Sequence, residues 1–204
     1  MKQESCNALY RYWDGLREPG AVAPTRSSIE PSAISAHLRD TFILEAVDSN
    51  FPFRLAGTRL CAIFGHELRG ASFLGLWSAT DRDQIETVLE GVSEEGTGSV
   101  LGVIARGPSN DDIALELLLL PLVQSAPAFD RILGALVPNQ LPYWLGVQPI
   151  RSLEVASVRQ LPPGDKAVVA GVFSPNSTRV EPTPLPPPSG RRRGRFVVLE
   201  GGKS

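Results

Sequence analysis

The sequence predicts an α+β domain in which helices cover one face of an antiparallel sheet. Two short strand patterns are followed by one helix with a clear 3.6-residue period, and three longer strand patterns come after it. The turns between the longer strands are short, which favours antiparallel pairing of neighbours. Of 204 residues, 42% are hydrophobic, which is enough to build a packed core and excludes a wholly disordered chain.

The first predicted element is a short N-terminal helix that ends before Pro19-Gly20. Four apolar side chains recur at the spacing of a single helix face: Leu9, Tyr12, Trp13 and Leu16. This stripe has two interpretations. It covers the core of its own domain, or it forms the contact between two copies of the chain, in which case these four residues are the dimer-contact candidates.

Residues 31–38 predict a second short helix, because Pro31 suits a first helical position. Residues 41–47 and 51–55 then predict a hairpin of two strands, and Pro52 places the second strand at a sheet edge or beside a bulge. A short helix follows Gly57 and ends at Gly65, a natural C-cap. Residues 67–77 read as a loop with one helical turn.

The clearest helix spans residues 81–95, where Ile85, Val88, Leu89 and Val92 share one face. Three strands are predicted after it, at residues 99–106, 112–122 and 131–137. Glu116 is the only charged residue inside the middle strand and is expected to face solvent.

The region after the third strand leaves two questions open. Tyr143-Trp144 lies between Pro142 and Pro149. The pair forms either a lid over a sheet edge or an exposed contact site. Residues 150–161 fit either a strand or a helix.

Composition divides the chain into a domain at residues 1–161, a proline-rich flexible linker at 162–190 and a basic tail at 191–204. Residues 162–204 have a net charge of +4, whereas residues 1–161 account for −6 of a total of −2. The basic cluster Arg191–Arg195 is a solvated tail or a contact for an acidic partner, anionic lipid or nucleic acid. Phe196–Leu199 predicts a short strand that pairs with its own sheet or with a partner.

Several functional classes are disfavoured by what the sequence lacks. The chain has two cysteines and two histidines in all, too scattered for a zinc site or a disulfide framework. It contains neither a nucleophile elbow nor a phosphate-binding glycine loop, and its net charge argues against nucleic-acid binding. We expect a non-enzymatic, cytoplasmic protein without a metal, a signal peptide or a transmembrane segment.

The order of elements and a series of short motifs resemble the PAS domain superfamily, and in particular a short stand-alone bacterial PAS-like family. The matching segments are Leu9–Trp13, Phe53–Thr58, Phe64–Gly70, Phe73–Trp77, Leu120–Leu122, Arg131–Leu136 and Glu200–Gly202. The resemblance implies a five-stranded antiparallel sheet with helices over one face and an N-terminal cap helix. It also implies a space between sheet and helices that can hold a small molecule, and a role as a sensor or interaction module.

The resemblance points to no cofactor for this chain. Residues 57–62 lack the reactive-cysteine motif of flavin photosensors, and the helix at 81–95 has no histidine to bind haem. The first functional hypothesis is a sensory or protein-interaction module that acts through a homodimer or a signalling partner.

The alternative hypothesis is a sensor with a small apolar ligand. If no ligand binds, the same side chains simply pack the hydrophobic core. The candidates for lining the pocket are Phe53, Leu55, Phe64, Phe73, Trp77, Leu117 and Leu133.

Overall fold

The computed structural model describes residues 1–46, 49–108, 111–124 and 129–161. Within these ranges the chain forms one sheet of six strands, in the order β2-β1-β5-β4-β3-β6, and every neighbouring pair is antiparallel. The strands are β1 (Thr41–Glu45), β2 (Phe53–Ala56), β3 (Gly98–Arg106), β4 (Ile113–Leu122), β5 (Arg131–Pro138) and β6 (Ser152–Leu161). The α+β class is confirmed.

The sixth strand is the one that the sequence left ambiguous. β6 pairs with β3 along its whole length and extends the expected five-stranded sheet at that edge. β2 forms the opposite edge, in agreement with Pro52 just before it. The predicted linker at 162–190, the tail at 191–204, the cluster Arg191–Arg195 and the strand Phe196–Leu199 lie outside the described residues.

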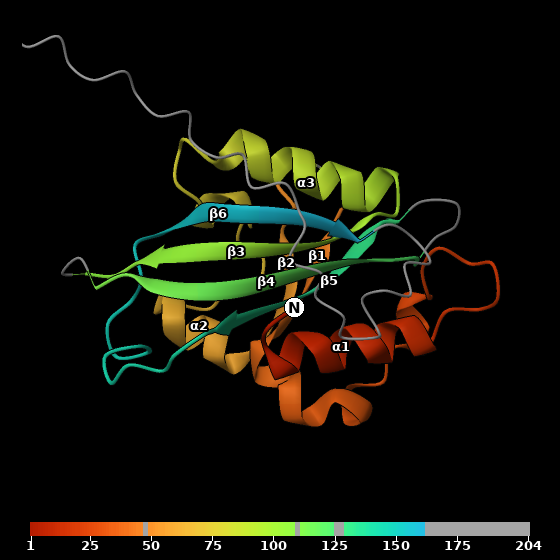
Figure 1. Cartoon of the computed structure of the whole chain (residues 1–204), viewed down its shortest axis with the longest axis horizontal. Coiled ribbons are helices and arrows are strands. Elements are labelled where there is room, and N and C mark those ends of the chain that lie inside the picture. The colour runs from red at the N-terminus through yellow and green to blue at the C-terminus, as the bar shows by residue number, and fades with distance from the viewer. Residues whose placement is uncertain (47–48, 109–110, 125–128, 162–204) are drawn as a thin grey trace, which may run out of the picture. The chain divides into compact units, whose positions relative to one another are not determined.

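Helices lie against both faces of the sheet (Figure 1). The inner face, which carries Phe42 and Leu117, packs against α2, η3 and α3. The outer face, which carries Ile43 and Leu118, packs against α1 and η2. The helices of the described residues are α1 (Glu4–Gly15), η1 (Arg26–Ser28), η2 (Pro31–Asp40), α2 (Thr58–Phe64), η3 (Leu74–Leu76) and α3 (Arg82–Glu94).

Coverage of both faces explains why β4 and β5 read as nearly continuous apolar runs. Alternate residues of β4 belong to the inner and outer clusters, so each residue is buried on one face or the other. None of the helices in the described ranges combines the length and the hydropathy needed to cross a membrane.

Glu116 does not face solvent, and that expectation is corrected here. It lies on the outer face of β4 beneath the start of α1 and is only 8% exposed. Its carboxylate accepts hydrogen bonds from the backbone N–H groups of Lys2, at 2.6 Å, and Gln3, at 3.1 Å. The carboxylate thereby pairs two donors at the helix start that would otherwise be left unsatisfied.

The connection between β5 and β6 places Tyr143 and Trp144 in different surroundings. Trp144 is buried in the inner cluster, whereas Tyr143 is 94% exposed. Backbone hydrogen bonds within the connection join Val147 and Gln148 to the Trp144 carbonyl, and Ile150 N–H donates to the Ile63 carbonyl of α2 at 3.0 Å. The connection is therefore anchored at one side chain and exposed at its neighbour.

Candidate functional site

The space between the inner face and the helices brings together five of the seven predicted pocket residues. Phe53, Phe64, Phe73, Trp77 and Leu117 are all buried in one hydrophobic cluster. Phe53 and Leu117 come from the sheet, whereas the other three come from α2 and the η3 region. We call this packed cluster the inner chamber.

Leu55 and Leu133 do not join the inner chamber. The pairing of β1 with β2 shifts by one residue, so that Leu44 faces Phe53 while Ile43 faces Leu55. Arg54 is the extra residue of this β-bulge, and it places Leu55 on the outer face. Leu133 faces Ile43 across β1 and β5 and packs in the outer cluster.

Aromatic rings in mutual contact fill part of the inner chamber. The ring centroids of Phe42, Phe53 and Phe73 form a triangle with sides of 5.5–5.6 Å, and Trp77 lies 5.9 Å from Phe73. Such offset and edge-on pairs stabilise a core beyond their buried area.

Phe42 is a chamber residue that the sequence analysis did not name. Its ring lies over Gly134 of β5, where an added Cβ would come within 2.1 Å of the ring. A glycine inside an apolar strand often marks such a close approach, and Gly134 was the available signal.

Trp77 carries the one unsatisfied polar group that the described residues place in the inner chamber. Its side chain is 2% exposed, and its indole N–H has no hydrogen-bond acceptor among them. A buried donor without an acceptor costs about 1–3 kcal/mol, so native proteins leave few of them.

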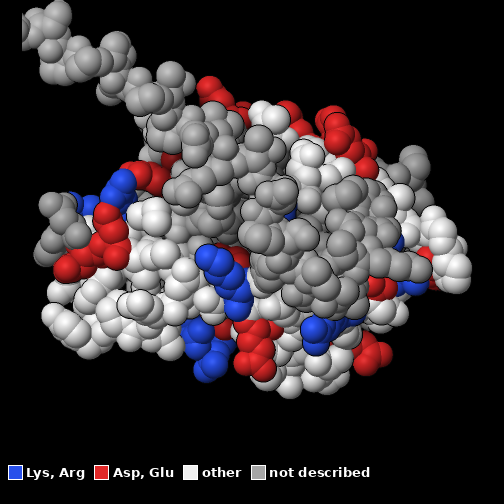
Figure 2. Space-filling model, in the orientation of Figure 1, with Lys and Arg blue, Asp and Glu red and all other residues white. Residues whose placement is uncertain are grey.

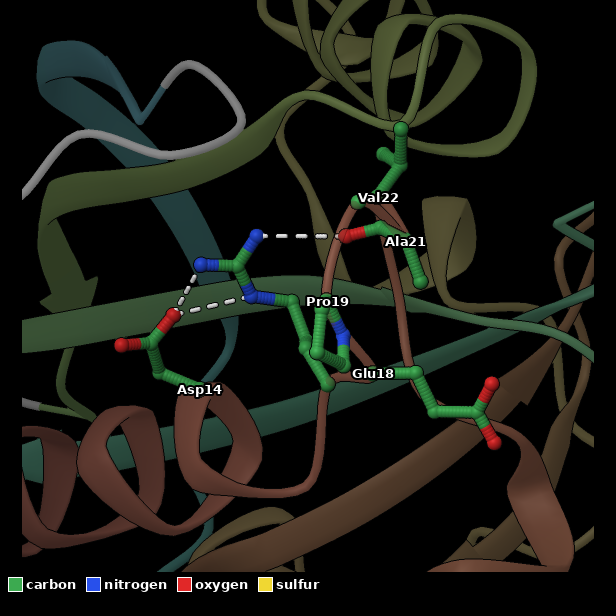
Figure 3. A pocket seen from close by; sticks show the side chains of 7 residues that line it. Asp14, Glu18, Pro19, Ala21 and Val22 are labelled. Carbon is green, nitrogen blue, oxygen red and sulfur yellow. Dashed lines mark hydrogen bonds and ion pairs between the residues drawn. The ribbon is translucent and has the colours of Figure 1, made fainter.

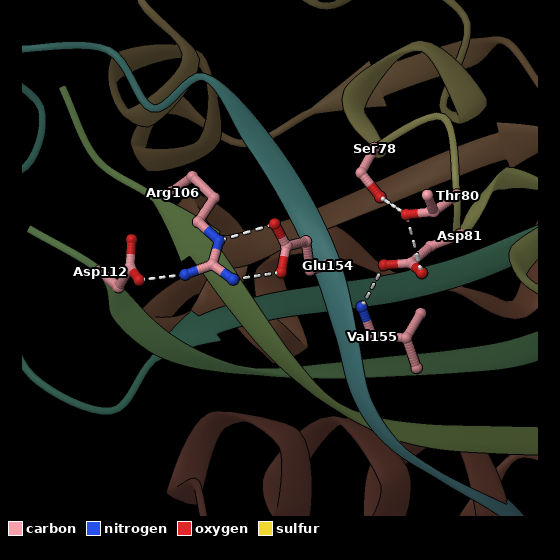
Figure 4. A network of polar contacts seen from close by, with 7 residues as sticks. All are labelled: Ser78, Thr80, Asp81, Arg106, Asp112, Glu154 and Val155. Carbon is pink, nitrogen blue, oxygen red and sulfur yellow. Dashed lines mark hydrogen bonds and ion pairs between the residues drawn. The ribbon is translucent and has the colours of Figure 1, made fainter. Parts of the chain in front are cut away.

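The segment that follows Trp77 is joined directly to β6. Ser78 N–H donates to the Leu153 carbonyl at 2.9 Å, and the Asp81 carboxylate accepts from Val155 N–H at 2.9 Å. Val155 is next to a shift in the β3–β6 register, where Val103 pairs with Val155 and Gly102 with Ser157. Figure 4 shows Asp81 reaching β6 from the start of α3.

A second set of polar contacts fixes the same end of β6 to β3 and β4. Arg106 of β3 binds both carboxylate oxygens of Glu154 on β6 and pairs with Asp112 just before β4 (Figure 4). The hydrogen bonds from Arg106 lower the pKa of the Glu154 carboxyl. Residues 153–155 are therefore connected to the inner helices and to the sheet at once.

The four dimer-contact candidates of α1 face the protein's own sheet. Leu9 and Trp13 are buried, and the half-buried Tyr12 and Leu16 pack against the same outer cluster. The Trp13 indole N–H donates to the Pro121 carbonyl at 2.8 Å. The stripe thus lies against β4 and β5, as the first of its two interpretations requires.

Beyond α1 the chain lines a hollow of about 430 Å³ between residues 14 and 22 (Figure 3). Arg17, one of its lining residues, pairs with Asp14 and donates to the Ala21 carbonyl. The charge of Arg17 is therefore balanced by Asp14 within the hollow. In the described part of the chain, no three His, Cys, Asp or Glu side chains are grouped as metal ligands.

Solved structures of low similarity include PAS and light-oxygen-voltage (LOV) proteins. The Rhodobacter sphaeroides LOV protein is 14% identical with a TM-score of 0.42, over 50% of this chain and 60% of that one, so the chain spans less than two thirds of its length. The PAS domain of an HTR-like protein from Haloarcula marismortui is 18% identical with a TM-score of 0.38, over 52% of this chain and 89% of that one.

An RNA-binding light-oxygen-voltage receptor is 13% identical with a TM-score of 0.43, over 65% of this chain and 38% of that one. No curated protein sequence matches the chain. The family model described as "PAS domain" matches residues 1–137, so that β6 and the connection before it lie beyond the match. Because this match covers more than half of the chain, the protein belongs to the PAS domain family, a family of sensory modules.

Proposed function

We propose that the protein is a non-enzymatic sensory module of bacterial signalling, with a small molecule in the inner chamber as its input and an altered protein contact as its output. The observation that carries the proposal is the buried indole N–H of Trp77, which lacks an acceptor among the described residues. The ligand has an apolar body that suits the phenylalanine rings and one hydrogen-bond acceptor for Trp77.

The contacts of Trp77 supply a route from the chamber to the sheet edge. A ligand that draws the indole N–H toward itself moves a backbone segment held to β6 by Ser78 and Asp81. Glu154 lies between Leu153, whose carbonyl accepts from Ser78, and Val155, whose N–H donates to Asp81, and it is paired with Arg106. Ligand binding and the position of β6 are therefore energetically coupled, which is what a sensor needs.

Native mass spectrometry of the freshly purified full chain tests the input. We expect a bound small molecule, and we expect Trp77→Phe to lower its occupancy by about fivefold, because one hydrogen bond is lost while an aromatic ring remains. Trp13→Phe is the matched control, since it removes an indole N–H from the opposite face of the sheet. Absence of any bound mass, together with no thermal shift in a metabolite screen, contradicts a ligand-dependent sensor.

Self-association is a second candidate activity, favoured by the connection between β5 and β6. Three of its large apolar side chains are exposed, namely Leu141, Tyr143 and Val147. Residues 139–149 contain no charged side chain, so two copies can meet through the same patch without like-charge repulsion. The hydrogen bonds to Trp144 hold the patch in place before contact, which lowers the entropic cost of association.

Sedimentation of the full chain over a range of concentrations tests this second activity. We expect a dimer that Tyr143→Ser weakens at least about tenfold, because exposed tyrosines are frequent binding hot spots. Val158→Ser is the control, since it removes an exposed apolar side chain of β6 outside the connection. A protein that remains monomeric at high concentration rules out this activity.

A further inference from the structure

A small hollow on the outer face of the sheet is lined by three arginines. It has a volume of about 230 Å³ and lies where β1 ends and β5 begins, beside the edge strand β2. Its lining residues are Arg26, Ile43, Arg54, Leu55, Gln124 and Arg131. These residues come from η1, three strands and the segment after β4, so the fold assembles the hollow from distant parts of the chain.

The β-bulge in β2 builds one wall of this hollow. Because Arg54 is the extra residue, Leu55 turns to the outer face and lies opposite Ile43. Ile43 is buried at the floor, while Leu55 is partly exposed at the side. The hollow therefore combines an apolar floor with a rim of guanidinium groups.

Among the described residues, two carboxylates lie close to the three arginines. Glu45 is the partner of two of them, with its carboxylate 3.1 Å from Arg131 and 3.7 Å from Arg54. Asp130, which precedes Arg131 in the sequence, accepts from the Gln124 backbone N–H. Three guanidinium groups and these two carboxylates leave one positive charge among the residues that the structure describes here.

The arginines differ in how firmly they are held. The Arg131 side chain is 10% exposed, pairs with Glu45 and donates to the Asp130 carbonyl at 2.7 Å. The Arg54 side chain is 57% exposed, and its distance to Glu45 exceeds that of a hydrogen bond. The Arg26 side chain makes no ion pair or hydrogen bond with any residue that the structure describes. The guanidinium groups of Arg26 and Arg54 are thus available to a ligand, whereas that of Arg131 is held by Glu45 and the Asp130 carbonyl.

We propose that this hollow binds a small organic anion through Arg26 and Arg54. A guanidinium group presents a planar fork of donors that matches the oxygens of a carboxylate or a phosphate. The apolar floor of Ile43 and Leu55 suits a short hydrocarbon stem on the same molecule. The site lies on the opposite face of the sheet from the inner chamber and does not depend on the sensory role proposed above.

Two-dimensional NMR of the full chain at physiological salt tests the site, with butyrate and inorganic phosphate as separate probes. We expect saturable shifts at the amides of Ile43, Arg54 and Leu55 with at least one of the two anions. Butyrate alone assigns a carboxylate with an apolar stem, and phosphate alone assigns a phosphate group. Butyramide, which has the stem without the charge, is expected to cause no saturable shift.

Variants at the rim separate a built site from general attraction of anions. We expect Arg26→Gln and Arg54→Gln each to weaken binding at least about tenfold, as the loss of a charged hydrogen bond predicts. Arg11→Gln is the matched control, because it removes the same charge from the exposed side of α1. The proposal is overturned by shifts that fail to saturate with both anions, by equal binding of butyramide, or by equal losses in the Arg11 variant.

Discussion

The two cysteines differ in their surroundings, although both are free thiols. Cys6 is fully buried on the side of α1 that faces the sheet, with its Sγ atom 3.9 Å from the Glu116 carbonyl oxygen. Burial raises the pKa of the Cys6 thiol well above its ordinary value, and the nearby Glu116 carboxylate raises it further. Cys61 lies half-buried on α2, next to Glu67. Because the thiolate is the reactive form, the two residues should differ in alkylation.

Treatment of the folded protein with iodoacetamide at pH 8 should therefore modify Cys61 and leave Cys6 unmodified. Peptide mass spectrometry measures the two sites separately. In denaturant both should react, because the burial that protects Cys6 is lost. Rapid modification of Cys6 under native conditions contradicts the packing of α1 on the sheet.

At the scale of elements, the contact between β1 and β5 depends on the lack of a side chain at Gly134. Phe42 occupies the space above Gly134, and no Cβ fits there without displacement of the ring. Gly91 offers a contrast, since it lies within α3 and an added Cβ would meet nothing within 4 Å. Replacement of glycine by alanine should thus have opposite effects on stability at Gly134 and at Gly91.

We expect Gly134→Ala to lower the free energy of unfolding by about 1–3 kcal/mol through overpacking. Gly91→Ala should raise it by about 0.5–1 kcal/mol, because alanine restricts the unfolded chain and favours the helix. Urea denaturation of both variants measures these changes. A Gly134→Ala variant as stable as the parent protein argues against the described contact between β1 and β5.

The packing of α1 allows a test of its own. Leu9→Ala should cost about 2–5 kcal/mol of stability, because the side chain is completely buried against the outer face. Arg11→Ala, on the exposed side of the same helix, should change stability by no more than about 0.5 kcal/mol. If Leu9→Ala instead leaves stability unchanged and weakens self-association, the α1 stripe is a contact between copies.

At the scale of the whole molecule, the described residues contain both hydrophobic clusters. The inner and outer clusters lie on opposite faces of one sheet, and all of their described members belong to residues 1–161. A chain that ends at residue 165 should therefore unfold within about 4 °C of the full chain, a difference of less than about 1 kcal/mol. Calorimetry measures the transition. A much larger fall indicates that the segment beyond residue 161 contributes to the core.

Much of the fold could be predicted because local patterns specify local structure. The helix predicted at 81–95 is α3. Gly65, the predicted C-cap, is the left-handed residue that ends α2. The strands at 99–106, 112–122 and 131–137 are found as β3, β4 and β5 within one or two residues of their predicted ends. Periodicity and capping act over a few residues, so one sequence is enough to show them.

The candidate site was predictable only in part. The aromatic residues of the inner chamber were found from the resemblance and the element order, but Phe42 was missed because nothing local distinguishes it from other strand residues. The three arginines of the outer hollow are separated by many positions, so no motif links them. Only the sheet brings Arg26, Arg54 and Arg131 to one place.

The sequence by itself determined the order of the elements, the α+β class and the apolar character of the strands, because each of these is set by side chains close together in the chain. Tertiary structure decided which face each strand residue occupies. The bulge at Arg54 reverses the face of Leu55, and the helix above β4 turns Glu116 from an expected surface residue into a buried partner of backbone N–H groups. Both outcomes depend on pairing register and on what covers a face, and those are relations between segments that lie far apart in the chain.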